Sequence, residues 1–362
     1  SIQRLISFVK FDSLYKRTQS LWSLLVLSIF VETSCNRYNR DECISCHVYE
    51  PLMEHPVSEW HLTTDQARNM AEKIKNVEVL NTLAQQEINL TGGEASQNPD
   101  IVEICKIFQT ITPHVCLHTN LDILSEKSKR WSRLVDIMKL NARVDITLYP
   151  TVWESSQKLF LEKMLELQNK LIVNVVYESL SDLKNQIGLL LNFFKDKGIT
   201  HVTELLQTYA QKVAGLVSEH PNCDEKLFTV HMGDTEAFAS QPDFIFGISL
   251  LPAFDVDKNG FRAMASLPFP RDKYLIGCPA ARGSIDIMTI QQNGEMTPCC
   301  DVGNLKCQPK FGNVLKDSPK QIMETMDTSM KLLASGVSKN HKNIKAGKAG
   351  TQVEEGIPPY CQ

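Results

Sequence analysis

The sequence predicts an α/β protein with a partial, TIM-like (β/α)6 barrel followed by a small second domain. Over the first two-thirds of the chain, short apolar segments alternate with helix-length amphipathic segments, which is the pattern of repeated βα units around a parallel sheet. About six such repeats fit, fewer than the eight of a closed barrel. Around residues 237–273 the chain becomes rich in Pro, Gly, Phe and Asp and loses its helical period, which indicates a loop-rich connection.

The apolar segments define six expected strands. They lie at 24–32, 87–90, 115–119, 143–148, 171–176 and around 228–231, with helices expected at 64–75, 100–111, 121–138, 155–169 and 181–195. The first strand lies in the apolar run Leu21 to Val31, which is about half of the ~20 residues that a membrane span requires. This run leads straight into a cysteine cluster with no small-residue cleavage site, so a buried parallel strand fits it better than a signal peptide.

Composition limits the classes of function. A chain of 362 residues with 43% hydrophobic and 22% charged residues has the make-up of an ordinary globular protein. A net charge of -4 provides no basic field for a phosphate backbone, so neither nucleic acid nor a membrane is an expected partner. Eleven cysteines without a convincing signal peptide favour metal or cluster ligation in the cytoplasm over a disulfide framework.

The second domain carries the signals of a hairpin. Ile285 to Gln291 favours a strand, Asn293-Gly294 is a tight-turn pair, and Glu295 to Pro298 returns toward the first strand. We therefore expect an N-terminal extension at 1–20, the barrel at 21–235, a linker at 236–273 and the second domain at 274–362.

Three cysteines follow the first expected strand. Cys35, Cys43 and Cys46 form C-x7-C-x2-C at the carboxyl edge of the sheet, where βα loops build active sites. Three thiolates on one loop can hold a 4Fe-4S cluster by three irons and leave the fourth iron open. From these residues alone, a zinc site that recruits His47 or His55 is about equally well supported.

Two further motifs resemble those of the radical S-adenosylmethionine (SAM) superfamily. Gly92-Gly93-Glu94 at the second strand is similar to that family's glycine-glycine-glutamate motif, and Thr119-Asn120 is similar to its threonine-asparagine pair after the third strand. The resemblance implies that the glycines admit backbone groups to the SAM amino group and that Glu94 helps to hold its charge. The chain departs from the family by four extra residues between its first two cysteines, and by Ser45 where an aromatic residue is usual.

The second domain resembles the SPASM domain or the shorter twitch domain of the same enzymes. Cys278, Gly294 and Cys299 fit the C-x15-G-x4-C spacing at the start of that domain, and the dense cysteine run of a full SPASM domain is missing. The resemblance therefore favours a twitch-like domain with one auxiliary 4Fe-4S cluster, held by Cys278, Cys299 and two of the three cysteines Cys300, Cys307 and Cys361. Cys307 and Cys361 are the preferred pair, because the adjacent Cys299 and Cys300 are hard to place on one cluster. Cys105 and Cys116 lie in an expected helix and strand and are interpreted as core residues.

This resemblance implies an enzyme. A reduced cluster would cleave SAM to a 5'-deoxyadenosyl radical, which abstracts hydrogen from a peptide or small molecule that is then oxidised or crosslinked. The implied partners are SAM, that unknown substrate and an electron donor such as flavodoxin or ferredoxin. Two alternatives remain open: a non-catalytic iron-sulfur or zinc protein on the same fold, and a radical methyl or group transferase. No catalytic acid or base can be named from the sequence.

Overall fold

The computed structural model describes most of the expected barrel and part of the region beyond it. The described residues are 26–35, 60–122, 125–177, 180–219, 235–241, 244–252, 287–297 and 310–331. The positions of Cys43, Cys46, Cys278, Cys299, Cys307 and Cys361 lie outside these residues, as do the expected strand around 228–231 and both chain ends.

The described strands form one sheet of nine, in the order β6-β7-β5-β4-β3-β2-β1-β8-β9. All pairs from β7 to β8 across the centre are parallel, and β6 and β9 pair antiparallel at the two edges. Their bounds are β1 Val26–Glu32, β2 Ile88–Gly92, β3 Val115–Thr119, β4 Arg143–Thr147, β5 Leu171–Tyr177, β6 Thr235–Gln241, β7 Phe244–Pro252, β8 Ile287–Ile290 and β9 Met296–Thr297. The parallel α/β class predicted from the sequence is confirmed.

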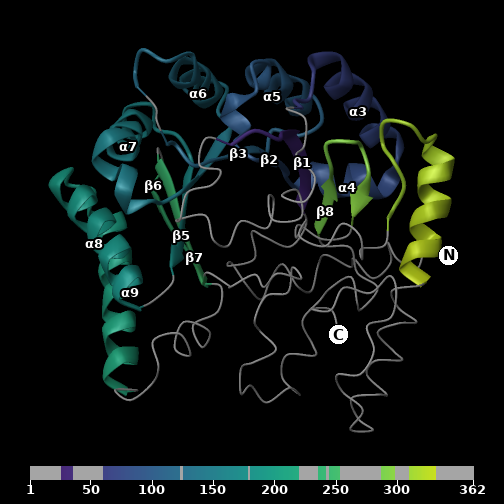
Figure 1. Cartoon of the computed structure of the whole chain (residues 1–362). Coiled ribbons are helices and arrows are strands. Elements are labelled where there is room, and N and C mark those ends of the chain that lie inside the picture. Colours follow the sequence, from purple (N-terminus) through teal and green to yellow (C-terminus); the bar gives the residue numbers. More distant parts are fainter. Residues whose placement is uncertain are drawn as a thin grey trace, which may run out of the picture.

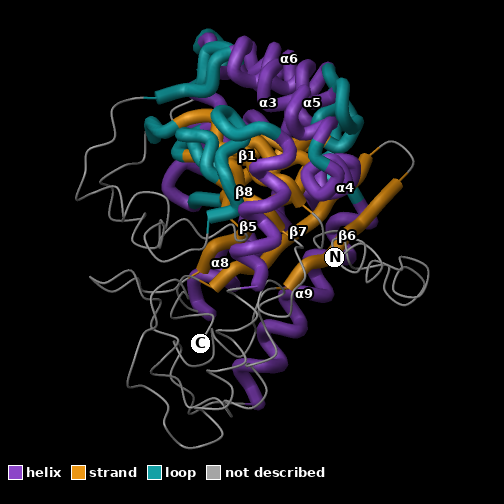
Figure 2. Tube along the Cα trace, turned by 90° about the vertical axis from the view of Figure 1, so that its right-hand side faces the viewer, coloured by secondary structure: helices purple, strands orange, loops and turns teal. Residues whose placement is uncertain are grey.

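The helices lie along the outer side of the curved sheet (Figures 1 and 2). They are α3 Thr64–Asn76, α4 Glu78–Gln86, α5 Ile101–Gln109, α6 Lys129–Lys139, α7 Lys158–Glu166, α8 Leu180–Asp196 and α9 Thr200–Glu219, with a further helix at 319–331. No helix among the described residues is long and apolar enough to cross a membrane.

Helix α3 illustrates why these segments are helical. Thr63 caps its first turn, since the Thr63 hydroxyl accepts from the Gln66 amide and the Gln66 side chain returns to the Thr63 amide. The buried residues Ala67, Met70, Ala71 and Ile74 recur at helical spacing and pack on the sheet.

The two faces of the sheet differ in chemistry. Leu27, Ile29, Ile88 and Leu90 join the apolar core under the helices. The residues between them face the other way, toward the inside of the arc, because side chains alternate along a strand. At one level of the ladder these inner residues are all polar or titratable: Thr289, Ser28, Asn89, Cys116 and Arg143.

The stretch 236–273, expected as a linker, begins with two strands. Strand β7 is the sixth parallel strand and pairs along its whole length with β5, while β6 closes that edge. The loop-rich interpretation was therefore wrong for residues 236–241 and 244–252. Strand β7 was missed because Gly247 and Pro252 interrupt its apolar run and are typical of loops.

The predicted hairpin is present, but in an unexpected place. Strands β8 and β9 pair antiparallel around Gly294, whose φ is +82° and whose hydrogen faces the Asn313 side chain. Strand β8 also pairs in parallel with β1, so residues 287–297 continue the main sheet. The four-part division of the chain, with a separate second domain, stays a prediction.

The helix predictions were right in position and less accurate in extent. The expected helix at 121–138 begins only at Lys129, after Leu121 takes a φ of +53° and Ser128 provides the cap. Helices α4 and α9 were not expected. The segment before α7 forms a wider turn, Trp153–Gln157, of the π type.

Candidate functional site

Cys35 lies three residues beyond the end of β1, at the carboxyl edge of the parallel strands. Glu32 shapes this turn, because its Oε1 accepts hydrogen bonds from the amides of Thr33 and Ser34, both at 2.9 Å. Thr33 is fixed in turn by Trp60, whose amide donates to the Thr33 hydroxyl at 2.9 Å. Cys35 is thus held on an ordered turn and remains partly exposed.

The two glycines bring the end of β2 against this turn. Gly92 has a φ of +139°, and a Cβ at this position would lie 2.2 Å from the Glu32 carbonyl oxygen. The Gly93 amide donates to that same oxygen at 2.9 Å, and the Glu94 amide donates to the Ser34 carbonyl at 2.8 Å. A side chain at residue 92 would force the two strand ends apart.

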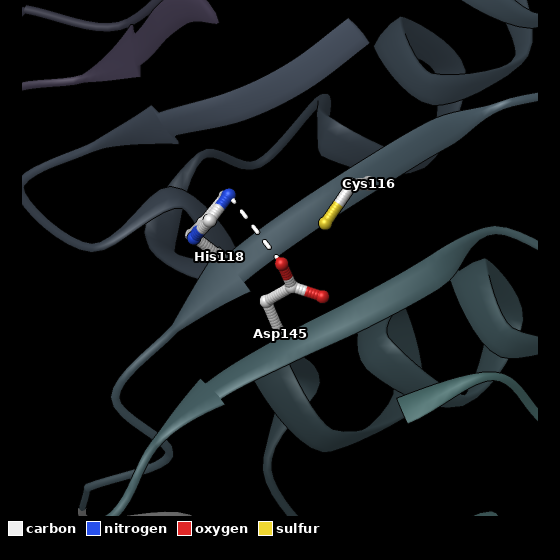
Figure 3. Close-up of side chains that lie close together, drawn as sticks. All are labelled: Cys116, His118 and Asp145. Atoms are coloured by element: carbon white, nitrogen blue, oxygen red, sulfur yellow. Dashed lines mark ion pairs between the residues drawn. The ribbon is translucent and has the colours of Figure 1, made fainter. Parts of the chain in front are cut away.

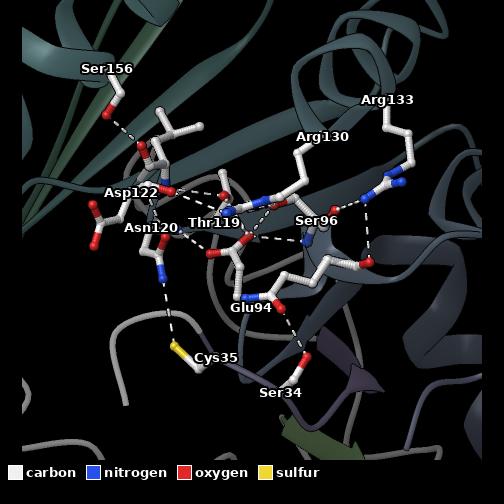
Figure 4. Close-up of polar contacts among 12 residues, drawn as sticks. Ser34, Cys35, Glu94, Ser96, Thr119, Asn120, Asp122, Arg130, Arg133 and Ser156 are labelled. Atoms are coloured by element: carbon white, nitrogen blue, oxygen red, sulfur yellow. Dashed lines mark hydrogen bonds and ion pairs between the residues drawn. The ribbon is translucent and has the colours of Figure 1, made fainter. Parts of the chain in front are cut away.

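Glu94 joins the ends of β2 and β3. Its side chain is only 1% exposed. Its Oε1 accepts from the Ser96 amide at 3.0 Å, from the Ser96 hydroxyl, and from the Thr119 hydroxyl at 2.7 Å. Its Oε2 accepts from the Asn120 amide at 2.7 Å (Figure 4). The described hydrogen bonds of the Glu94 carboxylate therefore come from neighbouring protein groups. A direct contact between Glu94 and the ammonium group of a ligand stays a prediction.

Asn120 connects this carboxylate to the cysteine. Its side-chain Nδ2 lies 3.6 Å from Cys35 Sγ, within hydrogen-bonding distance for sulfur, and its Oδ1 accepts from the Asp122 amide at 2.9 Å. The five predicted residues Gly92, Gly93, Glu94, Thr119 and Asn120 thus form one continuous network with Cys35.

Several residues of this network were not predicted. Arg130, on α6, donates to the Ser96 hydroxyl and to the Asp122 carbonyl, and its Nη2 lies 3.5 Å from Glu94 Oε1. Gln157 donates to the carbonyls of Asn120 and Thr147, at 3.0 and 2.8 Å. These side chains come from helical segments that carry no recognisable motif, so the sequence offered no signal for them.

A second polar group lies on the inner face of β3 and β4. Arg143 pairs bidentately with Glu87 and also with Asp145, where its Nε lies 2.8 Å from Oδ1. His118 Nε2 lies 3.7 Å from Asp145 Oδ2 (Figure 3). Burial raises the pKa of Glu87 above its usual value despite the Arg143 charge beside it.

Two cysteines of the described chain are deeply buried. Burial raises the pKa of the Cys105 thiol to about 12. It also raises the pKa of Cys116 well above its usual value, and the Asp145 carboxylate adds to the increase. Cys105 lies in the apolar core below the helices, as predicted, whereas Cys116 lies among charged groups on the opposite face of the sheet.

No protein-family model matches the chain, and no curated protein matches it. The solved structures it resembles include three of SuiB from Streptococcus suis. SuiB bound to the precursor peptide SuiA superimposes with a TM-score of 0.45 at 15% identity, covering 81% of this chain and 63% of that one. SuiB bound to S-adenosylmethionine gives a TM-score of 0.44 at 15% identity, over 81% and 62% of the two chains. SuiB alone gives 0.43 at 14%, over 81% and 64%. This chain thus spans less than two-thirds of the length of SuiB.

Chemically, the network around Cys35 provides one sulfur ligand, an amide donor directed at it, and an edge of the sheet fixed by buried hydrogen bonds. Such a donor stabilises negative charge on the sulfur, as it does around metal-bound thiolates. Cys43 and Cys46 follow Cys35 by eight and eleven residues in the sequence and lie outside the described residues.

Proposed function

We propose that this chain is a radical SAM enzyme, in which Cys35, Cys43 and Cys46 hold a 4Fe-4S cluster. One observation carries the proposal: the turn with Cys35, the Gly92-Gly93-Glu94 segment and the Thr119-Asn120 pair are joined by direct hydrogen bonds. These motifs are far apart in the sequence, since Gly92 follows Cys35 by 57 residues and Asn120 follows it by 85. Their meeting at the carboxyl edge of a parallel sheet is what a shared site requires.

The residues fit such a cluster. Cys35 is accessible enough to be a ligand, and its sulfur already has an amide donor of the kind that surrounds cluster sulfurs. When bound, the cluster would supply the electron that cleaves SAM and so starts hydrogen abstraction. The protein would hold the cysteine turn through Glu32, Gly93 and Glu94, and the barrel would keep water from the reaction.

We further propose that Gly92, Gly93 and Asn120 border the SAM position, because Asn120 contacts the Cys35 sulfur and the two glycines pack against the turn that carries it. The described contacts of Glu94 assign it a bracing function, in which the buried carboxylate fixes the Thr119-Asn120 pair relative to β2.

The substrate is a peptide or a small molecule, and the auxiliary cluster at Cys278, Cys299, Cys307 and Cys361 would take part in its oxidation. A flavodoxin or ferredoxin would supply electrons.

Anaerobic reconstitution with iron and sulfide, followed by addition of SAM and a reductant, tests the proposal. Wild type is expected to release 5'-deoxyadenosine and methionine. Cys35→Ala should lose about four irons and all product. Cys105→Ala, which removes a thiol buried in the apolar core under the helices, should retain both and is the matched control.

The other outcomes decide between the alternatives. A fully loaded cluster that yields no 5'-deoxyadenosine would contradict the enzyme proposal and favour a non-catalytic iron-sulfur protein. S-adenosylhomocysteine among the products would favour a methyl transferase. Unchanged iron in Cys278→Ala would remove the auxiliary cluster from the proposal and leave the SAM-cleaving cluster intact.

A further inference from the structure

Three side chains that can bind a metal meet on the inner face of the sheet. They are Cys116 and His118 of β3 and Asp145 of β4, and one ligand atom from each lies within 4.8 Å of the others. In Figure 3 the three side chains point toward one another from adjacent strands. Donor atoms on a single tetrahedral zinc lie roughly 3.4–3.6 Å apart, and the 3.7 Å between His118 Nε2 and Asp145 Oδ2 is close to that spacing.

The parallel register produces this meeting. His118 and Asp145 are partners across the β3–β4 ladder, and Cys116 lies two residues earlier on the same face. The adjacent residues Leu117 and Ile146 point to the opposite face and join the core under the helices. The group is therefore fixed by the backbone of two central strands, which is the kind of rigid support that a metal site needs.

The charge of the surroundings favours a cation. Glu87 and Asp145 share one guanidinium, that of Arg143, and all three side chains are less than one-fifth exposed. Two carboxylates against one cation leave one negative charge in excess, and uncompensated buried charge is costly. A divalent ion that displaces the Cys116 proton would bring this group to neutrality, while Arg143 would orient the Asp145 ligand from behind.

A neighbouring acceptor adds a second observation. Asn89 is the ladder partner of Cys116 on β2, and its Oδ1 is buried without a hydrogen-bond partner among the described residues. An amide oxygen in this position suits a water or hydroxide carried by a metal ion. His118, whose side chain is 35% exposed, opens the group toward the interior of the arc.

We propose that Cys116, His118 and Asp145 form a site for one divalent cation of the zinc type, with a fourth position open to water or substrate. Thiolate, imidazole and carboxylate are all zinc ligands, and three protein ligands with one open position are the pattern of catalytic zinc sites. None of these three residues is among those proposed to hold the 4Fe-4S cluster or SAM, and the proposal is independent of SAM chemistry.

The metal content of the full chain tests this site. Protein reconstituted anaerobically with iron and sulfide is equilibrated with zinc and freed of excess metal, and both metals are counted by mass spectrometry. Wild type should retain one zinc per chain that Cys116→Ser and Asp145→Asn lose, with iron unchanged. Cys105→Ser changes another buried cysteine and should retain the zinc. Equal zinc in Cys116→Ser and Cys105→Ser would overturn the proposal.

X-ray absorption at the zinc edge of the wild type provides a test that needs no variant to fold. One sulfur at about 2.3 Å with nitrogen and oxygen at about 2.0–2.2 Å is the expected first shell. Zinc surrounded by three or four sulfurs would mean that the ion occupies the cluster cysteines, and would overturn the proposal as well.

Discussion

The side-chain amide of Asn120 lies 3.6 Å from the sulfur of Cys35, although the two residues come from different strands. A hydrogen bond to a cluster sulfur stabilises the reduced, more negative state and so raises the reduction potential. If Cys35 holds the proposed cluster, we expect Asn120→Ala to retain its iron and to lower its reduction potential by an amount on the order of tens of millivolts.

A redox titration monitored by electron paramagnetic resonance measures this change. Asn169→Ala is the matched control, because Asn169 is also buried and donates to a carbonyl, that of Met138, away from Cys35. The same potential in Asn120→Ala and wild type would show that the amide does not act on the cluster.

Gly92→Ala is expected to destabilise the protein by about 2–4 kcal/mol, since the residue would be strained at positive φ and its Cβ would collide with the Glu32 carbonyl. Gly188→Ala provides the opposite case. It lies in α8 with nothing within 4 Å of an added Cβ, and alanine should stabilise that helix by about 0.5–1 kcal/mol. Urea unfolding of both variants checks the pair, and similar effects at the two positions would contradict the role given to Gly92.

Glu94→Gln is expected to cost about 2–4 kcal/mol, because an amide nitrogen would replace one of two oxygens that accept from Ser96, Thr119 and Asn120. Glu103→Gln removes a half-exposed carboxylate on α5 and should change stability by less than about 0.5 kcal/mol. The difference is measured by chemical denaturation. If both substitutions cost the same, Glu94 does not brace the motif.

The raised pKa of Glu87 predicts that the stability of the protein depends on pH. Burial raises its pKa in the folded protein, so the folded state binds the proton more tightly than the unfolded chain. The stability that this provides is present below the ordinary glutamate pKa and is lost as the pH rises through the folded value. Relative to Glu87→Gln, which has no proton to lose, wild type should therefore become less stable as the pH rises from about 4 toward 7. Unfolding free energies of the two proteins at several pH values test this, and a constant difference would contradict it.

The sequence predicted the centre of the sheet well and its edges poorly. Strands β3 and β4 were predicted almost to the residue, because each is a short segment with apolar residues at alternate positions between expected helices. Strand β7 was missed, since Gly247 and Pro252 interrupt its apolar run and are typical of loops. The pairing of β8 with β1 was missed for another reason: contacts between distant segments leave no local signal.

The same distinction holds for the site. Gly92, Glu94 and Asn120 could be singled out because they belong to short motifs. These motifs meet at the turn with Cys35, and their contact with SAM stays a prediction. Arg130 and Gln157 were not found, because their contacts depend on where α6 and the turn before α7 lie in three dimensions. Cys116 was interpreted as a core residue, since a cysteine in an apolar strand gives no indication of the charged residues on the neighbouring strand.

The pairing of β8 with β1 has a consequence for how the protein assembles. Strand β1, which leads into the cysteine turn, is buried along its whole length, and β8 covers one of its two edges. During synthesis residues 33–286 are added between β1 and β8, so β1 leaves the ribosome long before β8. Until then β1 has an unpaired edge, which is a site where other chains can add. The sheet around β1, which leads to Cys35, is therefore completed late in synthesis. A metal that bound before the chain left the ribosome would bind to a protein whose sheet is still incomplete.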